Sequence, residues 1–429
     1  MSNLNLIPIG KLFDLEKGSL QSSKCTEGEY TFITAAEEWK THNEYSHECE
    51  ALIFAAAASG SLGRTHYIND KFITSDLCFI LTPKDSKKYP INLKFYHFVF
   101  NSLKDEIVKN TKSGTSKESI NQSNLRNYEI PYFEIDKQNL WIDKLVNTKS
   151  IKEDLELELS SGQSLLKQLK QTILQEAIEG KLTEKWRAKN PDIGTAKELL
   201  AQIKIEKEKL IKEKKLKASK PLAPINEDEI PFDIPSSWEW CRFGNIVEHN
   251  AGKTLDRGRN KGLAQKYITT SNLYWGYFIL DDLKEMLIDE SELSKCTVQK
   301  GDLLVCEGGE AGRSAVWEND ETICIQNHIH RVRPYQNINT YYLYYYLMKI
   351  FLTGEIDNYR NGMGIKNLSG KSLSTIIIPI APKEEQKEIV ATIEKFFAIC
   401  NELESEINQN KTTVENLMAT VLKEAFEQQ

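Results

Sequence analysis

The 429-residue chain has no long hydrophobic run, no paired cysteines and no excess of basic residues. Its longest weakly polar stretch, residues 51–63, is too short and too rich in glycine to cross a bilayer. The eight cysteines are scattered singly, without a Cys-x-x-Cys pair or a His/Cys cluster, which argues against structural zinc and for a reducing compartment. The sequence therefore predicts a cytoplasmic protein that binds neither a membrane nor a metal.

The net charge of −7 counts against a general affinity for nucleic acid, because a DNA-binding domain usually carries a net positive charge. Any DNA site in this chain must therefore be a local patch. The content of hydrophobic residues, 40%, is that of an ordinary globular protein, and the length is sufficient for two or three separate cores.

What the sequence does contain is an internal repeat. Residues 114–181 align without a gap on residues 362–429, and 15 of the 68 aligned positions are identical. The identical pairs include Gly114 and Gly362, Leu125 and Leu373, Pro131 and Pro379, Gln138 and Gln386, and Leu155 and Leu403. A spacing of 248 residues is too long for a solenoid, so it indicates two copies of one module.

Each copy begins with short β-type runs and ends in a helical pattern, which predicts an α+β fold. Among the expected runs are strands over 72–81 and 323–332 and helices over 93–108 and 340–352. Residues 181–220 hold 13 Lys or Arg against 6 Asp or Glu, and the prolines that follow indicate a linker. We expect a first globule over 1–140, a central helix over 141–188, a Lys-rich and Pro-containing linker over 189–235, a second globule over 236–380 and a C-terminal helix over 381–429.

The C-terminal segment has the heptad pattern of a coiled coil. Its seam consists of Ile389, Ile393, Phe396, Cys400, Leu403, Ile407, Asn410, Val414, Leu417 and Val421. The same pattern, 248 residues earlier, runs from Trp141 to Ile173, so we expect the two long helices to form an antiparallel coiled coil with a pseudo-twofold repeat. Gly162 and Asn410 occupy one aligned slot of the seam; this slot either fixes the helix register or is a plain surface position.

Two similar modules suggest a function in DNA recognition, because duplex DNA also has local twofold symmetry. A protein with one reading domain in each copy would contact two half-sites, and the length of its helices would set the gap between them. Because the two globules differ at most positions, the half-sites would differ in sequence.

Three segments, taken in order, resemble the specificity subunit of type I restriction-modification systems. They are Leu174-Gln175-Glu176-Ala177-Ile178-Glu179-Gly180-Lys181-Leu182-Thr183 with Trp186-Arg187, then Ile234-Pro235-Ser236-Ser237-Trp238-Glu239-Trp240-Cys241-Arg242-Phe243-Gly244, and then Ile378-Pro379-Ile380-Ala381-Pro382-Lys383-Glu384-Glu385-Gln386-Lys387-Glu388-Ile389-Val390. The resemblance covers essentially the whole chain. The first copy departs from the pattern, since Ile130-Pro131-Tyr132-Phe133-Glu134 keeps one proline where the second copy has two.

The resemblance implies two target-recognition domains, two conserved helical regions and a subunit that is not catalytic. It further implies two modification subunits that carry S-adenosylmethionine and methylate adenine, and restriction subunits that use ATP and Mg²⁺. The chain itself is expected to bind none of these cofactors. Consistently, the sequence has no Asn-Pro-Pro-aromatic methylation motif.

Residues that read DNA are expected on polar loops, because base edges require donors and acceptors while lysines and backbone amides hold phosphates. The glycines of Gly60-x-x-Gly63-Arg64 and Gly309-x-x-Gly312-Arg313 permit tight turns near a phosphate, although a plain hairpin with a solvated arginine fits as well. The candidate DNA-binding residues are Arg64, Lys112, Lys117, Asn121, Lys253, Arg257, Arg259, Lys261, Arg313, Gln326, Asn327, His328, Lys366, Asn367 and Lys371.

The segment from His328 to Arg333 alternates, which predicts His328 and His330 on one face of a strand and Arg331 and Arg333 on the other, with one face in the core. Without a third ligand nearby in sequence, the two histidines favour packing or a DNA-facing role over metal binding. Two rival functions stay open on the sequence alone. One is a coiled-coil adaptor that binds proteins, which agrees with the acidic net charge; the other is an enzyme that cleaves or methylates DNA by itself.

Overall fold

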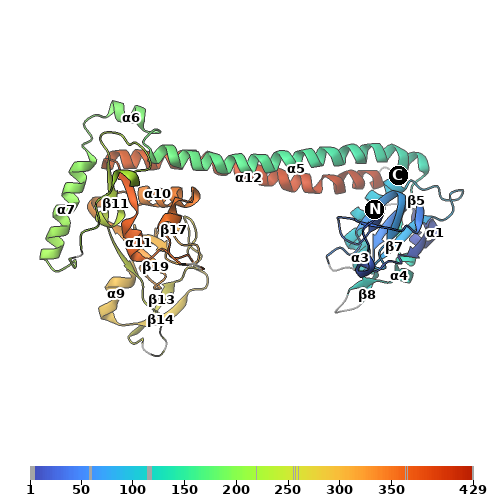
Figure 1. Cartoon of the computed structure of the whole chain (residues 1–429), viewed down its shortest axis with the longest axis horizontal. Helices are drawn as coiled ribbons and strands as arrows, with labels where there is room; N and C mark the ends of the chain where they lie inside the picture. The colour runs from blue at the N-terminus through green and yellow to red at the C-terminus, as the bar shows by residue number, and fades with distance from the viewer. Residues whose placement is uncertain are drawn as a thin grey trace. The chain divides into compact units, whose positions relative to one another are not determined.

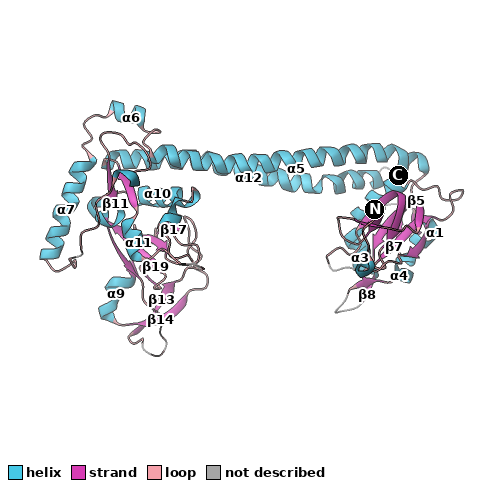
Figure 2. Ribbon diagram, in the orientation of Figure 1, coloured by secondary structure: helices cyan, strands magenta, loops and turns pink. Residues whose placement is uncertain are grey.

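The structure, a computed structural model, describes residues 5–57, 60–113, 118–218, 220–254, 256, 258, 260–362, 364 and 366–427. It contains two compact units, each of which mixes helices and strands (Figure 2). Unit 1 comprises Met1–Gly162 with Glu406–Gln429, and unit 2 comprises Gln163–Ser405. The predicted α+β class is therefore confirmed. Within the described part of the chain, no helix has both the length and the apolar character needed to cross a membrane.

Unit 1 is built on a six-stranded sheet in which only β3 and β6 pair in parallel. In spatial order the strands are β2 (Phe13–Lys17), β7 (Cys78–Pro83), β5 (His47–Ala55), β6 (Thr65–Thr74), β3 (Tyr30–Ile33) and β4 (Lys40–His42). Two small pairs, β1 (Leu6–Pro8) with β10 (Glu129–Pro131) and β8 (Lys112–Ser113) with β9 (Ser119–Ile120), complete its strands. Its short helices are α1 (Ile9–Leu12), η1 (Ser22–Lys24), α2 (Leu93–Ser102), α3 (Lys104–Thr111) and α4 (Gln122–Asn127). The helix expected over 93–108 is thus present as two helices, α2 and α3, on either side of Leu103.

Unit 2 divides the corresponding strands between two four-stranded sheets. The first is β12 (Val247–Ala251), β19 (Ile329–Pro334), β16 (Leu303–Cys306) and β17 (Ser314–Val316), and the second is β14 (Lys284–Ile288), β13 (Leu263–Ile268), β18 (Ile323–Ile325) and β15 (Thr297–Val298). A pair, β11 (Glu239–Arg242) with β20 (Ile377–Ile380), corresponds to β1 with β10. The helices are α6 (Glu184–Lys189), α7 (Ala196–Lys212), η2 (Glu227–Glu229), α8 (Phe243–Ile246), α9 (Glu290–Cys296), η3 (Tyr335–Asn337), α10 (Thr340–Leu352), η4 (Glu355–Asn358) and α11 (Gly370–Thr375).

Two predicted strands are interrupted by turns. The run expected over 323–332 is β18 and β19, separated by Gln326, Asn327 and His328, and the run expected over 72–81 is the end of β6 and the start of β7. Neither turn contains glycine or proline, the strongest signals of a break, and the weaker turn formers Ser75, Asp76 and Asn327 stand within otherwise apolar runs. As described below, both turns lie where several loops meet.

The repeat found in the sequence recurs residue by residue in the structure. Helix α4 starts at Gln122 and α11 at Gly370, 248 residues later, and the backbone bridge of Ser113 with Ser119 corresponds to that of Asn361 with Asn367. The buried glutamines at the start of the long helices, Gln138 and Gln386, make equivalent bonds. The side-chain oxygen of Gln138 accepts from the backbone amide of Asn92, the N-cap residue of α2, at 2.7 Å. The side-chain oxygen of Gln386 accepts in the same way from Asn339, the N-cap residue of α10, at 3.0 Å. The two copies therefore share one local fold.

The two long helices, α5 (Ile135–Ile178) and α12 (Lys383–Glu427), lie side by side (Figure 1). In unit 1 the first part of α5 meets the last part of α12, and Trp141 and Leu145 share a core with Leu422 and Ala425. In unit 2 the last part of α5 meets the first part of α12, since Nζ of Lys170 lies 2.6 Å from a carboxylate oxygen of Glu404. The helices are therefore antiparallel, as the heptad pattern predicts.

The aligned slot at Gly162 faces a large side chain of the other helix. A Cβ at Gly162 would lie 3.6 Å from Cδ1 of Ile407, which is an ordinary van der Waals contact, so a methyl group would fit there. Gly162 is half-buried and Asn410 is exposed, as is the seam residue Leu403. A role of this slot in fixing the helix register stays a prediction.

The lysine-rich stretch assigned to a linker contains an ordered helix, α7, which packs within unit 2. Thr195 and Glu198 form a capping box at its start. Nζ of Lys207 donates to the carbonyls of Gly244 and Asn245 at 3.2 and 3.3 Å, and a Glu206 carboxylate oxygen accepts from the Gln336 backbone amide. These bonds fix α7 beside η3 and α8.

A buried carboxylate joins the three segments that carry the family resemblance. Glu385, at the start of α12, is fully buried and accepts hydrogen bonds from Thr183 Oγ1 at 2.8 Å, from Trp238 Nε1 at 2.8 Å and from Arg187. Arg187 also donates to the carbonyl of Gly180. Residues from all three segments therefore meet in one hydrogen-bonded cluster of Thr183, Arg187, Trp238 and Glu385, here called the Glu385 node.

Candidate nucleic-acid interface

In unit 2, loops that are far apart in the sequence meet through backbone hydrogen bonds. The amide of Lys253 donates to Ile325, and the amide of Asn327 donates back to the carbonyl of Lys253 at 3.0 Å. The amide of Glu307 donates to His328, and Glu307 accepts from the amide of Leu368, both at 2.8 Å. The loops that begin at Lys253 and Glu307, the turn at Gln326–His328 and the loop before Leu368 therefore form one surface.

Unit 1 builds the same junction with different side chains. The amide of Asp76 donates to the carbonyl of Leu20, and the amide of Ile120 donates to that of Ala56 at 2.7 Å. Leu20 and Ser75 form a parallel bridge that corresponds to the bridge of Lys253 with Gln326. The backbone thus presents equivalent loops in both units, whereas the residues on those loops differ.

The two Gly-x-x-Gly-Arg turns have the same hydrogen-bond pattern. The amide of Gly63 donates to Ala55 and that of Gly312 donates to Cys306, each at 2.8 Å. The backbone φ angles of Gly63 and Gly312 are +79° and +97°, a region that favours glycine. The tight turns predicted from the sequence are therefore present.

The arginines that follow these turns are engaged within their own units. Arg64 Nη1 donates to the carbonyl of Ala35 at 3.4 Å, and Arg313 Nη2 donates to that of Thr270 at 2.6 Å. Arg313 also pairs with Glu310, and its side chain is only 15% exposed. The geometry gives both arginines a role in holding a loop, in addition to any contact with DNA.

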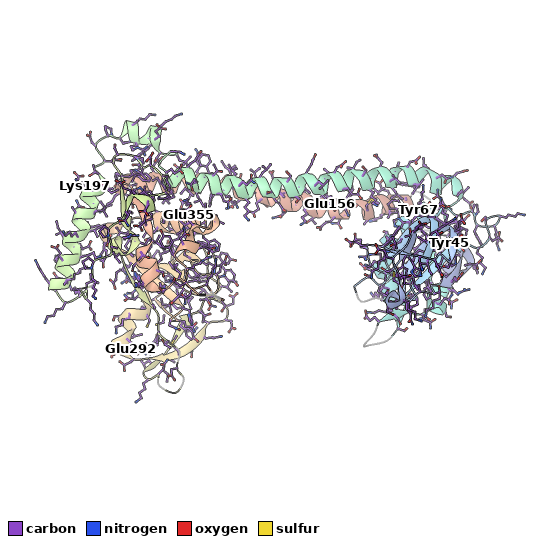
Figure 3. All side chains as sticks on the ribbon, in the orientation of Figure 1. Tyr45, Tyr67, Glu156, Lys197, Glu292 and Glu355 are labelled. Atoms are coloured by element: carbon purple, nitrogen blue, oxygen red, sulfur yellow. The ribbon has the colours of Figure 1, made fainter. Side chains whose placement is uncertain are left out.

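The remaining predicted residues fall into four groups. Those paired with a carboxylate are Lys112 with Glu118, Lys366 with Asp357, and Lys253 with Glu292, which lies on α9 (Figure 3). Asn121 caps α4 by accepting from the amide of Ser123, and Asn367 pairs its backbone with Asn361. The side chains of Lys261, His328 and Lys371 are exposed, and those of Gln326 and Asn327 are half-buried. Lys117, Arg257 and Arg259 lie outside the described residues.

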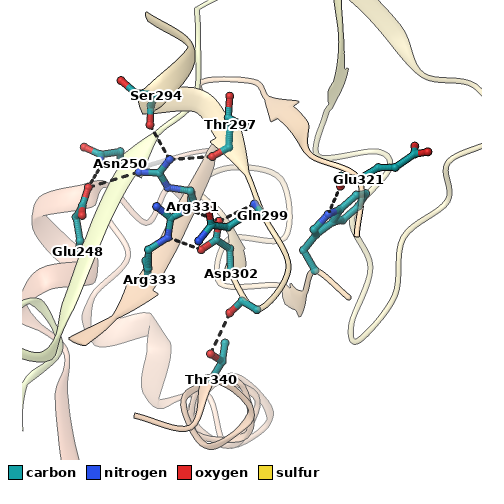
Figure 4. Close-up of polar contacts among 12 residues, drawn as sticks. Glu248, Asn250, Ser294, Thr297, Gln299, Asp302, Glu321, Arg331, Arg333 and Thr340 are labelled. Atoms are coloured by element: carbon teal, nitrogen blue, oxygen red, sulfur yellow. Dashed lines mark hydrogen bonds and ion pairs between the residues drawn. The ribbon is translucent and has the colours of Figure 1, made fainter. Parts of the chain in front are cut away.

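The alternation predicted from His328 to Arg333 is present only within β19, where His330 faces His249 and Leu368 and the two arginines, Arg331 and Arg333, lie on the opposite face. His328 belongs to the turn, and both His330 and Arg331 are buried, so the core covers both faces of the strand and not one. Arg331 Nη1 donates to the carbonyls of Ser294 and Thr297 at 2.9 and 2.8 Å, and Arg333 makes two bonds to Asp302 at 2.7 Å (Figure 4). Carbonyls supplied by other elements therefore stabilise the charge of the buried Arg331, whereas the buried carboxylate of Asp302 engages Arg333, whose side chain is 34% exposed.

A pair of histidines lies beneath the start of α11. The rings of His249 and His330 are 5.9 Å apart, His249 Nε2 bonds Ser374 Oγ at 2.6 Å, and His330 Nε2 lies 3.4 Å from Glu307. Burial, followed by the neighbouring His330, lowers the pKa of His249 to about 4, and burial also lowers the pKa of His330. Among the described residues no three histidine, cysteine or acidic side chains are grouped as metal ligands would be.

This pair is expected to make unit 2 sensitive to acid. The pKa of His249 is lowered from 6.5 to about 4 in the folded chain, so the unfolded chain binds the proton more readily. The contribution is fully present above pH 6.5 and is lost as the pH falls toward 4, which amounts to about 2 kcal/mol at pH 5. Urea unfolding at pH 7 and pH 5 measures this loss. In the variant His249→Gln the pH-dependent loss should shrink; an equal loss in variant and wild type would contradict the assignment.

A family model described as the type I restriction modification DNA specificity domain matches residues 1–160 and 235–411, which is most of the chain. The chain belongs to this family. It is accordingly a DNA specificity subunit, a non-catalytic component of a type I restriction-modification system.

Relatives and solved structures agree with this assignment. The specificity subunit of the type I restriction enzyme EcoAI of Escherichia coli is 29% identical over 254 residues, which cover 57% of this chain and 42% of that protein. That match therefore spans under half of the relative. The EcoDI specificity subunit of Escherichia coli is 23% identical, and the alignment covers 98% of this chain and 87% of that one.

Two solved structures share the fold of this specificity subunit. One, from work on the complex assembly and conformational transition of the type I R-M system, aligns with a TM-score of 0.70 at 14% identity and covers 98% of this chain and 97% of its own. The other, the HsdS subunit of Thermoanaerobacter tengcongensis, has a TM-score of 0.56 at 15% identity and covers 98% and 96%. At these identities the likeness concerns the fold alone.

Proposed function

We propose that each unit of this specificity subunit reads one half of an asymmetric, bipartite DNA site. The observation that supports this proposal is the repeated loop junction, in which one backbone framework presents different side chains in the two units. Lys253, Gln326 and His328 on the junction of unit 2 correspond in position to Leu20, Ser75 and Leu77 in unit 1. Equal frameworks with unequal side chains suit two half-sites of unequal sequence.

The candidate contacts are the predicted loop residues that remain accessible. Lys261, His328 and Lys371 are exposed, and Lys112 and Lys366 are exposed in spite of their ion pairs. Surface ion pairs are worth ~1 kcal/mol or less, so a phosphate can replace the carboxylate partner. Lys117, Arg257 and Arg259 remain part of the proposal on sequence grounds.

The proposal extends to the partners and the location of the chain. We assign α5 and α12 two roles: they set the distance between the half-sites and dock two modification subunits. Restriction subunits join the same complex. S-adenosylmethionine, ATP and Mg²⁺ belong to those partner subunits, and the complex acts in the cytoplasm. The proposed domains are those expected from the sequence, with recognition domains over 1–140 and 236–380.

A gel-shift titration of the purified chain, alone and with its modification subunits, tests DNA binding. We expect sequence preference and a steep loss of affinity with salt, because each neutralised phosphate contributes about 0.9 to the slope of log affinity against log salt. Replacing both Lys261 and Lys371 by alanine should weaken binding and reduce that slope by about 2. The double variant Lys197→Ala and Lys209→Ala removes equal charge from α7 and should leave the slope unchanged.

Two outcomes would replace the proposal. Absence of DNA binding, with and without the modification subunits, would favour the coiled-coil adaptor that the acidic net charge allows. An equal change of slope in the α7 variant would show that binding depends on overall charge and not on the loop junction.

A further inference from the structure

A stacked pair of tyrosines stands on the loop that follows β13. The rings of Tyr274 and Tyr277 are nearly parallel, at 10°, with centroids 5.1 Å apart. The amide of Tyr274 donates to the carbonyl of Tyr277 at 2.9 Å, which closes a tight turn at Gly276. Tyr277 is 55% exposed, although the ring of Tyr274 packs against its ring.

An arginine extends this stack on the side of Tyr274. Cζ of Arg313 lies 5.2 Å from the centroid of the Tyr274 ring, while Nη2 of the same arginine holds the carbonyl of Thr270. The Arg313 guanidinium, the Tyr274 ring and the Tyr277 ring together form an ordered column, whose last member, Tyr277, is exposed. The stack therefore fixes the orientation of Tyr277 before any partner binds.

The column belongs to the same surface as the loop junction of unit 2. The amide of Gln326 donates to Ile268, the last residue of β13, and the amide of Gly276 donates to Ser314, next to Arg313. The aromatic loop thus lies between the turn at Gln326–His328 and the Gly-x-x-Gly-Arg turn.

Unit 1 repeats the arrangement with another aromatic residue. The amide of Ser75 donates to Ile33, the last residue of β3, as that of Gln326 does to Ile268. Arg64 holds the carbonyl of Ala35, and Trp39, six residues after Ile33, is 41% exposed. Tyr274 likewise follows Ile268 by six residues. The indole of Trp39 is held from one side by His66, whose ring is 5.6 Å away.

We propose that the exposed aromatic ring on this loop, Tyr277 in unit 2 and Trp39 in unit 1, stacks on a DNA base that becomes unstacked in the complex. Two copies with little sequence in common keep an arginine-anchored loop after the equivalent strand, with an exposed ring on it: Trp39 six residues after β3 and Tyr277 nine residues after β13. A ring ordered in advance loses little entropy on binding, and every base offers a face on which it stacks. Arg64 and Arg313 are then positioning residues. This inference rests on the proposed function, since it requires that the loop junction faces DNA.

Photocrosslinking tests the contact directly. The probe is a duplex bearing the methylated sequence found in the host genome, with iododeoxyuridine placed at successive thymine positions. The wild-type complex should crosslink at one or two positions to peptides that contain Tyr277 or Trp39. Tyr277→Ala should lose its crosslink and bind about tenfold more weakly, with an unchanged salt slope because no charge is removed. Tyr277→Phe keeps the ring and should bind like the wild type.

Tyr45 supplies a matched control in unit 1 (Figure 3). It is 41% exposed, its ring is tilted against that of Tyr30 with centroids 4.7 Å apart, and Lys71 Nζ lies 5.1 Å from the centre of its ring. It precedes β5, whose far end carries the Gly-x-x-Gly-Arg turn, so roughly 26 Å of strand separates it from the junction. Tyr45→Ala should leave affinity and crosslinks unchanged.

The outcomes separate this inference from the proposed function. If the wild type binds the duplex with sequence preference but Tyr277→Ala and Trp39→Ala bind equally well and no crosslink maps to these loops, the aromatic contact is overturned while DNA reading stands. If the wild type does not bind the duplex at all, the proposed function fails, and the inference fails with it.

Discussion

The variant Glu385→Ala is expected to lose about 3–5 kcal/mol of folding free energy, because it leaves the largely covered Arg187 and the buried donors of Thr183 and Trp238 without their shared partner. Glu385 is fully buried, and Arg187, Thr183 and Trp238 donate to it from three separate segments. A loss of this size is a large share of the stability of a typical domain. Chemical denaturation followed by tryptophan fluorescence measures it, since Trp238 lies in the node.

The neighbouring carboxylate provides the control. Glu384 is exposed and pairs only with Lys387, at 2.8 Å on the same face of α12. Surface pairs of this kind are worth ~1 kcal/mol or less, so Glu384→Ala should have a small effect. Similar losses for the two variants would mean that the node does not join the segments of unit 2.

The second large effect is expected on specificity. Exchanging residues 243–376 for the equivalent segment of another family member should change one half of the recognised sequence and leave the other half and the gap intact. Each mismatched base pair costs ~1–3 kcal/mol, roughly additively for separate positions, so affinity for the original site should fall by about a thousandfold or more. Methylation assays on the old and new sites measure this change.

The boundaries of this exchange follow from the structure. They retain the pairing of β11 with β20 and also keep Trp238, so the Glu385 node remains complete. The reciprocal exchange of residues 9–127 retains β1 with β10 and should change the other half of the site. An exchange in either unit that altered both halves would contradict independent reading.

The long helices and the repeat could be predicted from the sequence because they depend on local periodicity. The apolar positions from Ile389 to Val421 recur at the spacing of a heptad, and α10 has the bounds expected for it, Thr340–Leu352. Its tyrosines at 342 and 344–346 are buried. The glycine turns could be recognised for a similar reason, because only glycine accepts their backbone angles readily.

Features that depend on distant partners could not be predicted. Arg313 is a candidate DNA ligand on the sequence alone, but in the structure its guanidinium donates to the Thr270 carbonyl and pairs with Glu310. Asn121 looks like a base reader, yet its side chain caps α4. Conversely, Trp39 and Tyr277 carry no motif, and only the end of the neighbouring strand identifies their loop. The sequence locates the loops that we propose to bind DNA, but it cannot divide their residues between those that support the loops and those that contact DNA.

A map of adenine methylation at single-base resolution, in cells that carry this subunit with its modification subunits, tests bipartite reading most directly. The expected result is one motif of two short, different sequences separated by a fixed gap, with one methylated adenine in each part on opposite strands. A single continuous motif or a palindrome would contradict the account. So would methylation of the motif that persists in cells from which this subunit has been deleted.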